Sequence, residues 1–473
     1  MIAFAAVTAF VVSIFNRREE HTEGFLAADR NVSTLQGAFS IAVSWVWAPA
    51  IFVCSMQAYK MGLPGIFWFT LPNVLCFFVF APLALRLRRL NPGGYTLPEF
   101  IDRRFNRHRG VHLAFLCLFF GYQLAAIVSN SVAGGYLLHE LSGISIKAAI
   151  VGMVVIALSY SLYSGLKASV LTDVVQMIMV LGLALIVVPF CVAAAGGMPA
   201  VVAGLGGADG THTSVFDPWI AFSMGIPMTI SLLSGPICDQ MFFQRAMAVK
   251  EENVVRTFVL GGLIFGMVPI TLSLLGFLAA SQVAAGNMTV NDPQMVGAAA
   301  IGHFLPKAAL YAFAFMAFAG LCSTLDSALC AASSLGSVDV YRRYINQSAA
   351  DSQTLKAARI AMIAVAGAGL FIALLEPRIL WTFFISGALA AAGFFPTILS
   401  LCWPRVSAHG VLSGVVVSLV LGTPLAVYAN LRDDPYLNVA AALLSVILGL
   451  LVCVLVSILE GKPELEDVVM ETV

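Results

Sequence analysis

The sequence predicts an all-α integral membrane protein with about thirteen transmembrane helices. Of its 473 residues, 60% are hydrophobic and 11% are charged, whereas an average soluble domain has roughly 45–50% apolar and about 25% charged residues. Apolar stretches follow one another along the chain, and roughly 20 such residues in a helix span a bilayer. Lysine and arginine fall unequally between the stretches, which is typical of a membrane protein with one orientation.

The predicted spanning helices are apolar windows bounded by charged residues and by clusters of glycine, proline and asparagine. They lie near residues 1–15, 35–58, 64–87, 111–138, 144–163, 166–195, 217–242, 257–281, 301–336, 359–375, 379–403, 409–429 and 436–459. Arg17 and Arg18 follow the first window, whereas a signal peptide has its positive charges first, so we expect this helix to be retained. The window 1–15 is shorter than a helix that spans a bilayer, and we expect that a few residues are missing from the start of this sequence.

The positive charges predict the orientation of the chain. Of its 25 lysine and arginine residues, five lie in loops of one side: Lys60, Lys147, Lys307, Arg378 and Arg432. The remaining 20, Arg245 among them, lie on the other side, and cytoplasmic loops carry the excess of positive charge. With an odd number of spans, we expect the N-terminus outside the cell, the C-terminus in the cytoplasm, and the protein in the plasma membrane.

A single transmembrane domain is expected over residues 1–473. It divides into a flanking helix and loop (1–34), a ten-helix core in two inverted halves (35–403), and two flanking helices with a short cytoplasmic tail (404–473). The longest polar stretches, 88–110 and 339–358, are too short to form a separate domain. The activity is therefore expected within or across the bilayer.

Two of the predicted spans are interrupted by proline. The span 39–59 carries Pro49 behind Ser44, Trp45 and Trp47, and the span 222–243 carries Pro227 and then Ser234-Gly235-Pro236. Proline removes a helical hydrogen bond, and freed carbonyls are tolerated in a membrane only where protein, water or a ligand satisfies them. Counted from the second span, these are the first and sixth helices, which is the pattern of a transporter with inverted five-helix halves. Ordinary kinks, common in membrane helices, are the alternative.

A further span carries a stripe of polar residues. In "GLCSTLDSALCAASS" (320–334), Ser323, Asp326 and Ser327 stand at i, i+3 and i+4 on one helix face, with Thr324 one step round. Hard cations bind oxygen ligands, so this face and the carbonyls of a broken helix predict an ion site. A second intramembrane acid, Asp173, supports the prediction because such acids usually mark ion paths.

The energy of insertion leaves another interpretation of this helix open. An acid at the helix centre costs about 2.5–3.5 kcal/mol, and each large apolar residue returns about 0.3–0.6 kcal/mol. The neighbours of Asp326 can therefore offset its cost. Asp326 would then be protonated and bonded to a neighbour, while the serines would serve only to let helices pack closely.

Several classes of function lack the residues they require. Net charge is zero, and no basic cluster alternates with aromatic residues as nucleic-acid binding would need. The nine cysteines and seven histidines form neither a C-x-x-C pair nor an H-E-x-x-H motif. We therefore expect no nucleic-acid partner, no catalytic residues and no metal ion other than a coupling ion.

Five motifs in order resemble the sodium:solute symporter family. They are "EGFLAADRNV" before the first core helix, "YTLPEFIDRRF" after the second, "YSLYSGLKASVLTDVVQ" in the fifth, "DQMFFQRAMAVK" at the end of the sixth and "GLCSTLDSALCAASSLGSVDVYRRY" in the eighth. The resemblance covers nearly the whole chain. It implies a leucine-transporter-like 5+5 inverted repeat of ten core helices with flanking helices.

The resemblance also implies ion-binding residues. The main sodium site would use the hydroxyls of Ser323 and Thr324 with the carbonyls of Gly320, Val43 and Val46. A second cation or proton site would use Asp173, Asp326 and Ser327. Many relatives have a hydroxyl or a small residue where this chain has Asp326, so the extra carboxylate could strengthen a second sodium site or carry a proton instead.

The solute is expected beside the first interrupted helix. The segment "SWVWAPA" followed by "AYKMGLPGIFWF" resembles the urea and polyamine branch of the family more than the sugar branch. Ser44, Trp45, Trp47, Gln123 and Ser234 are the candidate solute-binding residues, although tryptophan also commonly anchors helix ends. Because no intramembrane arginine or lysine is apparent to clamp a carboxylate, a small neutral or cationic nitrogen compound is favoured over an amino acid or carboxylate.

The predicted function is sodium-coupled import of a small polar solute by alternating access, with sodium as the coupling ion. The expected partners are the solute, sodium and the lipid bilayer, with no obligatory protein partner. A proton-coupled symporter of the same fold is one alternative. A membrane solute sensor is another, although sensors of this kind normally add a soluble signalling domain. A channel would not require two interrupted helices in inverted register.

Overall fold

The computed structural model describes residues 4, 8, 19–377, 379–432 and 434–461. Within these ranges the chain is helical, apart from loops and an isolated bridge between Val32 and Val249. Eleven of the described helical segments are long and apolar enough to cross a membrane. The predicted all-α membrane fold is confirmed.

The principal helices follow the predicted spans closely. They are α2 (Thr22–Ala27), α3 (Thr34–Ser44), α4 (Ala48–Leu90), α5 (Leu97–Arg104), α6 (Arg109–Ser142), α7 (Ile146–Ser164), α8 (Leu166–Ala194), α9 (Met198–Ala203), α10 (Pro218–Ile220), α11 (Ile226–Ser234), α12 (Gln240–Ala248), α13 (Val254–Ala284), α14 (Val296–Phe304), α15 (Lys307–Ser334), α16 (Asp351–Ala373), α17 (Ile379–Cys402), α18 (Ala408–Val417), α19 (Thr423–Leu431) and α20 (Pro435–Glu460). Short 3-10 and π-helical segments join some of them, including η3 (Pro236–Cys238), η6 (Leu335–Ile345) and η7 (Ser418–Gly422).

Helix α4 contains parts of two predicted spans, which accounts for one of the two helices by which eleven differs from thirteen. Its backbone turns at Gly62, whose φ is 58°. A Cβ atom there would lie 2.4 Å from the carbonyl oxygen of Leu205, so only glycine fits this turn. The predicted span 1–15 lies outside the described residues except for Phe4 and Thr8.

Polar residues cap the N-termini of several helices. The side chains of Ser33, Thr96, Ser145 and Asp434 each accept a hydrogen bond from a backbone N–H in the first turn that follows. Such caps satisfy donors that have no partner within the helix.

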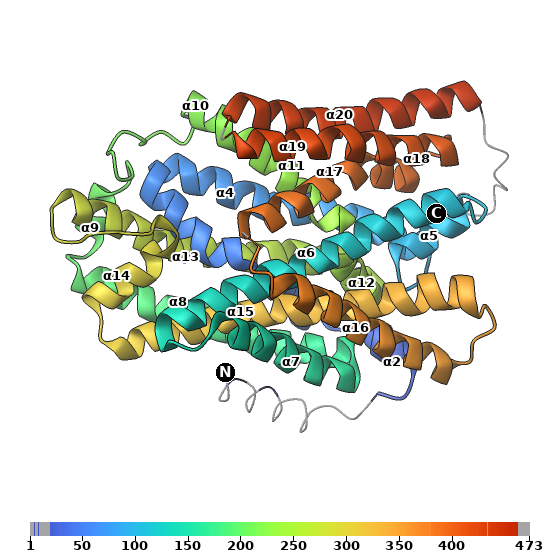
Figure 1. Cartoon of the computed structure of the whole chain (residues 1–473), viewed down its shortest axis with the longest axis horizontal. Helices are drawn as coiled ribbons and strands as arrows, with labels where there is room; N and C mark the ends of the chain where they lie inside the picture. The colour runs from blue at the N-terminus through green and yellow to red at the C-terminus, as the bar shows by residue number, and fades with distance from the viewer. Residues whose placement is uncertain (1–3, 5–7, 9–18, 378, 433, 462–473) are drawn as a thin grey trace.

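Two groups of helices pack around the site. Helix α13 lies along α3 and α4, whereas α15 packs against α6, α7, α8 and α16. Figure 1 shows α17, α18, α19 and α20 together along one edge of the molecule, with α2, α7 and α16 along the opposite edge. The interrupted helices lie between these edges.

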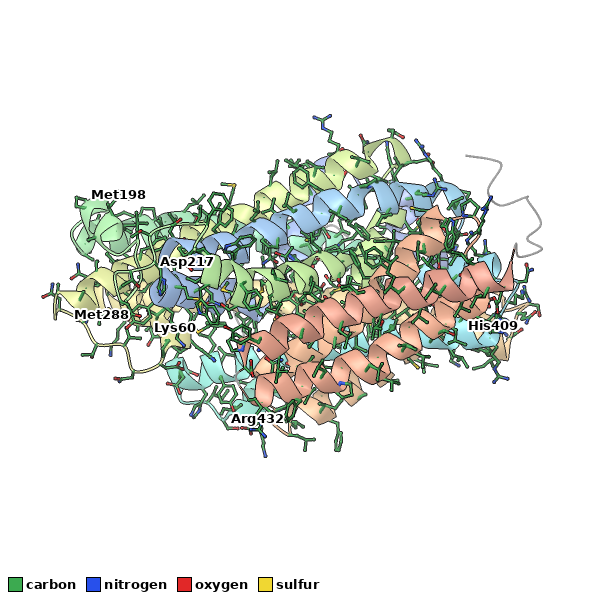
Figure 2. All side chains as sticks on the ribbon, turned by 90° about the horizontal axis from the view of Figure 1, so that it is seen from above. Lys60, Met198, Asp217, Met288, His409 and Arg432 are labelled. Atoms are coloured by element: carbon green, nitrogen blue, oxygen red, sulfur yellow. The ribbon has the colours of Figure 1, made fainter. Side chains whose placement is uncertain are left out.

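The two ends of the molecule carry different connections. Figure 1 places α9 and α14 at one end and α5 at the other. In Figure 2, Lys60, Met198 and Met288 lie at the first end and His409 lies at the second. Which end faces the cytoplasm stays a prediction from the charge distribution.

Candidate ion and solute site

The first interrupted helix breaks between Ser44 and Ala48. Within the break, Trp45 N–H donates to Ala42 O (3.2 Å) and Val46 N–H donates to Val43 O (2.9 Å), each three residues back. Helix α4 then starts anew, and its first N–H, from Ala48, donates to the side-chain oxygen of Asn130 at 3.0 Å. Pro49 lies in the first turn of α4, where the missing N–H needs no helical partner.

The hydroxyl of Thr324 on α15 lies among carbonyl oxygens at this break. Its Oγ1 donates to Ser44 O at 3.3 Å and Val46 O at 3.4 Å, and Gly320 O lies 3.5 Å away in its own helix. Gly320 permits the approach, since a Cβ there would lie 2.9 Å from Val46 Cγ1. The structure thus brings Thr324, Gly320 and Val46 together.

The remaining residues of the predicted main sodium site have other partners in this conformation. The carbonyl of Val43 accepts from Val46 N–H, and Ser323 Oγ donates to Asp173 Oδ1 at 2.5 Å. The Ser44 carbonyl, which was not predicted as a ligand, lies as near to Thr324 as that of Val46.

Asp173 on α8 is fully buried and forms an ion pair with Arg245 on α12. Arg245 Nη2 lies 2.9 Å from Asp173 Oδ2, and Arg245 also donates to Ser40 Oγ (2.8 Å) and Ser327 Oγ (2.6 Å). The sequence predicts Arg245 as one of the cytoplasmic loop charges and no arginine within the membrane. The structure instead places Arg245 in helix α12 rather than in a loop, and its side chain is only 1% exposed.

Asp326 on α15 is also fully buried, but its partners are uncharged. Its Oδ2 accepts from Tyr160 OH at 2.5 Å and its Oδ1 from Ser169 Oγ at 2.7 Å. Ser327 Oγ lies 3.3 Å from Asp326 Oδ1 and also receives a hydrogen bond from Arg245. Asp173, Asp326 and Ser327 therefore form one cluster with two carboxylates and a single guanidinium.

A small cavity of about 30 Å³ adjoins the break. It is lined by Trp45, Trp47, Pro49, Ala50, Phe69, Asn73, Tyr122, Ser231, Leu232, Ser386 and Gly387. The Trp45 indole N–H donates to Asn73 Oδ1 at 2.8 Å, and the rings of Trp47 and Tyr122 lie 5.5 Å apart. Two of the five predicted solute-binding residues, Trp45 and Trp47, thus line the cavity.

The other three predicted solute-binding residues do not line the cavity. Ser44 Oγ donates to Ser40 O and lies 3.0 Å from Ser327 Oγ. Ser234 Oγ donates to Ile230 O within α11, and Gln123 donates to Asp239 at 2.9 Å.

Four polar lining residues were not identified from the sequence: Asn73, Tyr122, Ser231 and Ser386. The sequence offered one signal for this group, the amide of Asn73 in an otherwise apolar span. A buried amide requires hydrogen-bond partners, so Asn73 indicated that other polar groups lie nearby.

A larger cavity of about 260 Å³ adjoins the small one. It lies between α11 and α17 on one side and α19 and α20 on the other, and its lining includes Asn430 and Asn438. Ser231 and Gly387 line both cavities. A Cβ on Gly387 would lie 2.7 Å from Ser231 Oγ, so these two residues form a tight contact where the cavities meet.

Comparisons with known proteins agree with this architecture. The chain is 25% identical over 92% of its length to a rice (Oryza sativa subsp. japonica) "Urea-proton symporter DUR3". It is 24% identical over 89% of its length to a "Urea active transporter" of Saccharomyces cerevisiae. It spans 64% and 60%, respectively, of the length of these two relatives. A "Sodium/glucose cotransporter" of Vibrio parahaemolyticus is 24% identical over 85% of this chain and 79% of its own length.

Solved structures share the fold. A Na+-coupled sialic acid symporter superposes with a TM-score of 0.79 at 17% identity, covering 96% of both chains. The nucleobase-cation-symport-1 family transporter Mhp1 superposes with a TM-score of 0.58 at 12% identity, covering 95% of this chain and 97% of its own. Residues 25–418 match the model of the sodium:solute symporter family. The protein therefore belongs to the sodium:solute symporter family.

Proposed function

We propose that this symporter imports a small uncharged nitrogenous solute of the urea type together with a monovalent cation, and that sodium binds at the Thr324 site. The observation that carries the proposal is the meeting of the Thr324 hydroxyl with the carbonyls of Ser44, Val46 and Gly320. Oxygen ligands from a broken helix suit a hard cation. The solute cavity begins at the next residue, Trp45.

The character of the cavity supports a small neutral solute. Its lining has aromatic faces, an amide and hydroxyls but no charged side chain. A cavity of about 30 Å³ has room for roughly two water molecules, so a bulky solute would need a wider state. Arg245 is engaged with Asp173 and does not serve as a clamp for a solute carboxylate. The printed names of the rice and yeast relatives agree with this class of solute.

Coupling would arise from rocking of α3, α4, α11, α12 and α13 against α6, α7, α15 and α16. Sodium stabilises the state in which both sides of its site meet, and it acts only through its different affinity for the two states. A potential of 100 mV supplies about 2.3 kcal/mol per ion. At about 1.4 kcal/mol per tenfold, one ion could concentrate a neutral solute roughly 40-fold from voltage alone.

Proton coupling is a second candidate because of the charge count around Asp326. Two carboxylates share one guanidinium, which leaves one negative charge to neutralise in a desolvated cluster. A proton on Asp326 or a second sodium ion beside Asp173, Asp326 and Ser327 would neutralise it. The name of the rice relative, a urea-proton symporter, favours the proton.

Transport into proteoliposomes tests the proposal. Uptake of urea and a panel of small amides, polyamines and amino acids would be measured with an inward sodium gradient, an inward proton gradient, both or neither. We expect uptake of urea-like solutes to rise with the sodium gradient. Uptake that ignored sodium at every pH would overturn the sodium site, and uptake of carboxylates but not amides would overturn the solute class.

The same vesicles test the orientation. We propose a plasma-membrane protein with the N-terminus outside and the C-terminus in the cytoplasm, on the basis of the charge distribution alone. Labelling of cysteines introduced at Lys60 and His409, at opposite ends of the molecule (Figure 2), would show the first outside and the second inside. Labelling in the opposite sense would overturn this orientation.

A further inference from the structure

Asp239 is a buried acid in the second interrupted helix that the ion sites above do not use. Helix α11 ends at Ser234, η3 follows, and Asp239 is extended (φ −118°, ψ 116°) before α12 begins. Its side chain is fully buried. The second interruption lies beside the solute cavity, because a Cβ on Gly235 would lie 2.5 Å from the Trp45 ring and 3.1 Å from the Tyr122 hydroxyl, and both residues line the cavity.

The hydrogen bonds of Asp239 involve only one of its two oxygens. Oδ1 accepts from the Gln123 amide Nε2 and from Met241 N–H, each at 2.9 Å. Oδ2 is buried and has no hydrogen-bond partner among the residues that the structure describes, and the same is true of Oε1 of Gln123. The two unpaired oxygens therefore belong to side chains that already share a hydrogen bond, from Gln123 Nε2 to Asp239 Oδ1.

A helix-capping role explains only part of this arrangement. Capping of α12 accounts for the bond from Met241 to Oδ1, but it leaves Oδ2 and Gln123 Oε1 unpaired. A buried unpaired acceptor destabilises the fold because its lost hydration is not replaced, and a buried charge without a counter-charge destabilises it more. Arg245, the basic residue close enough to act on Asp239, is ion-paired with Asp173. Tyr122 and Cys238, the other titratable groups beside it, bring no positive charge.

One proton on Oδ2 would supply a partner for both unpaired oxygens. The protonated Oδ2 would become a donor, and Gln123 Oε1 is the unpaired acceptor on the same partner. Together with the existing bond from Nε2 to Oδ1, the acid and the amide would then share two hydrogen bonds. We propose that Asp239 is a proton-binding site, and that its proton is shared with Gln123 in this conformation.

The position of the pair gives the proton a role in transport. This part of the inference rests on the proposed function, because it assumes that the interrupted helices move against α6. Gln123 belongs to α6 and Asp239 precedes α12. Their separation would break both hydrogen bonds and expose the acid, so the proton would be released in the state that opens this contact.

Infrared spectroscopy of the full-length protein in lipid tests the proton directly and needs no transport. We expect a carbonyl band of a protonated carboxyl at neutral pH that disappears in Asp239→Asn. Asparagine can repeat both hydrogen bonds to Gln123 and the cap of α12, so this variant should fold. Asp217→Asn is the matched control, since Asp217 also caps a helix but lies partly exposed at one end of the molecule (Figure 2). That variant should retain the band.

Two further variants assign the band. Gln123→Leu removes the partner amide, so the band should persist and shift to the frequency of a carboxyl with fewer hydrogen bonds. Asp326→Asn identifies any separate band from Asp326, a second buried acid whose hydrogen-bond partners are uncharged. Absence of a protonated carboxyl in the wild type, as for an ionised Asp239 bridged by water, would overturn the proposal. A spectrum unchanged by Asp239→Asn would overturn it too.

Proton flux tests the coupling role. In proteoliposomes with an internal pH indicator, we expect solute-driven proton entry in the wild type and its loss in Asp239→Asn. Wild-type proton flux in the variant would overturn the coupling role. A protein that moved no urea at all would contradict the proposed solute, whereas the infrared result on Asp239 would still stand.

Discussion

The two sides of the first helix break differ in how they satisfy polar groups. On one side, the Thr324 hydroxyl, two buried acids and Arg245 form a dense network in which charge dominates. On the other, Trp45, Trp47 and Asn73 line a cavity without charged side chains. The difference agrees with the proposal that one side binds the coupling ion and the other selects the solute by shape and hydrogen bonding. Substitutions on the charged side should therefore have larger effects than those on the neutral side.

Arg245→Ala should have the largest effect. It leaves Asp173 as a buried carboxylate without its counter-charge, which costs about 3–5 kcal/mol, so the free energy of unfolding in detergent should fall by that order. The double variant with Asp173→Asn should recover much of the loss, because the unpaired charge is removed. Equal destabilisation of the single and double variants would show that the ion pair does not hold this side together.

Thr324→Val should strongly weaken sodium dependence. The change keeps the side-chain shape but removes the hydroxyl beside the carbonyls, and a hydrogen bond or ligand to a charged group is worth about 1.5–3 kcal/mol. The sodium concentration for half-maximal uptake should rise roughly 10- to 100-fold, and Ser323→Ala added to it should abolish the dependence. Ser333→Ala is the control, since that hydroxyl donates to Cys330 O within its own helix. An unaltered sodium response in Thr324→Val would exclude this site.

Asp326→Asn should flatten the pH dependence of uptake. If Asp326 carries a proton, wild-type uptake increases as external pH falls, because more of the acid is protonated, and the amide removes this titration. Initial rates measured across a pH series would show the change, with Asp217→Asn as the surface control. A variant that kept the wild-type pH profile but lost its response to sodium would instead assign Asp326 to a second sodium ion.

Gly387→Ala should have the smallest effect of the four. The added Cβ would lie 2.7 Å from Ser231 Oγ, so Ser231 must shift where the two cavities meet. We expect a few-fold rise in the solute concentration for half-maximal uptake with little change in sodium dependence. Gly182→Ala is the matched control, because a Cβ there meets nothing within 4 Å. Equal effects of the two variants would show that this contact is not on the solute path.

The sequence was sufficient for the membrane class, for the spans that lie within the described residues and for the two interrupted helices. Apolar stretches near 20 residues long report bilayer insertion directly, and the prolines beside Trp47 and Ser234 mark where a helix cannot continue. The polar stripe from Ser323 to Ser327 was visible for the same reason, since helical periodicity places residues on one face.

Other parts of the site were missed because they depend on how separate helices meet. Arg245 follows the second interruption by a few residues, and the charge criterion assigned it to a loop. Its burial depends on Asp173, Ser40 and Ser327, which come from three other helices. The sequence predicts Gln123 as a solute-binding residue, and only the packing of α6 against the second interruption shows that its amide donates to Asp239.

The sequence by itself determined that this chain crosses a membrane many times, and where its helices break. Those properties follow from hydrophobicity and backbone chemistry, which act locally along the chain. Only the tertiary structure decided which carboxylate is paired with Arg245, which acids lack a counter-charge, and which residues line the cavity. These properties depend on distances between helices far apart in the sequence, and a buried charge is compensated only by groups that packing brings within a few ångströms.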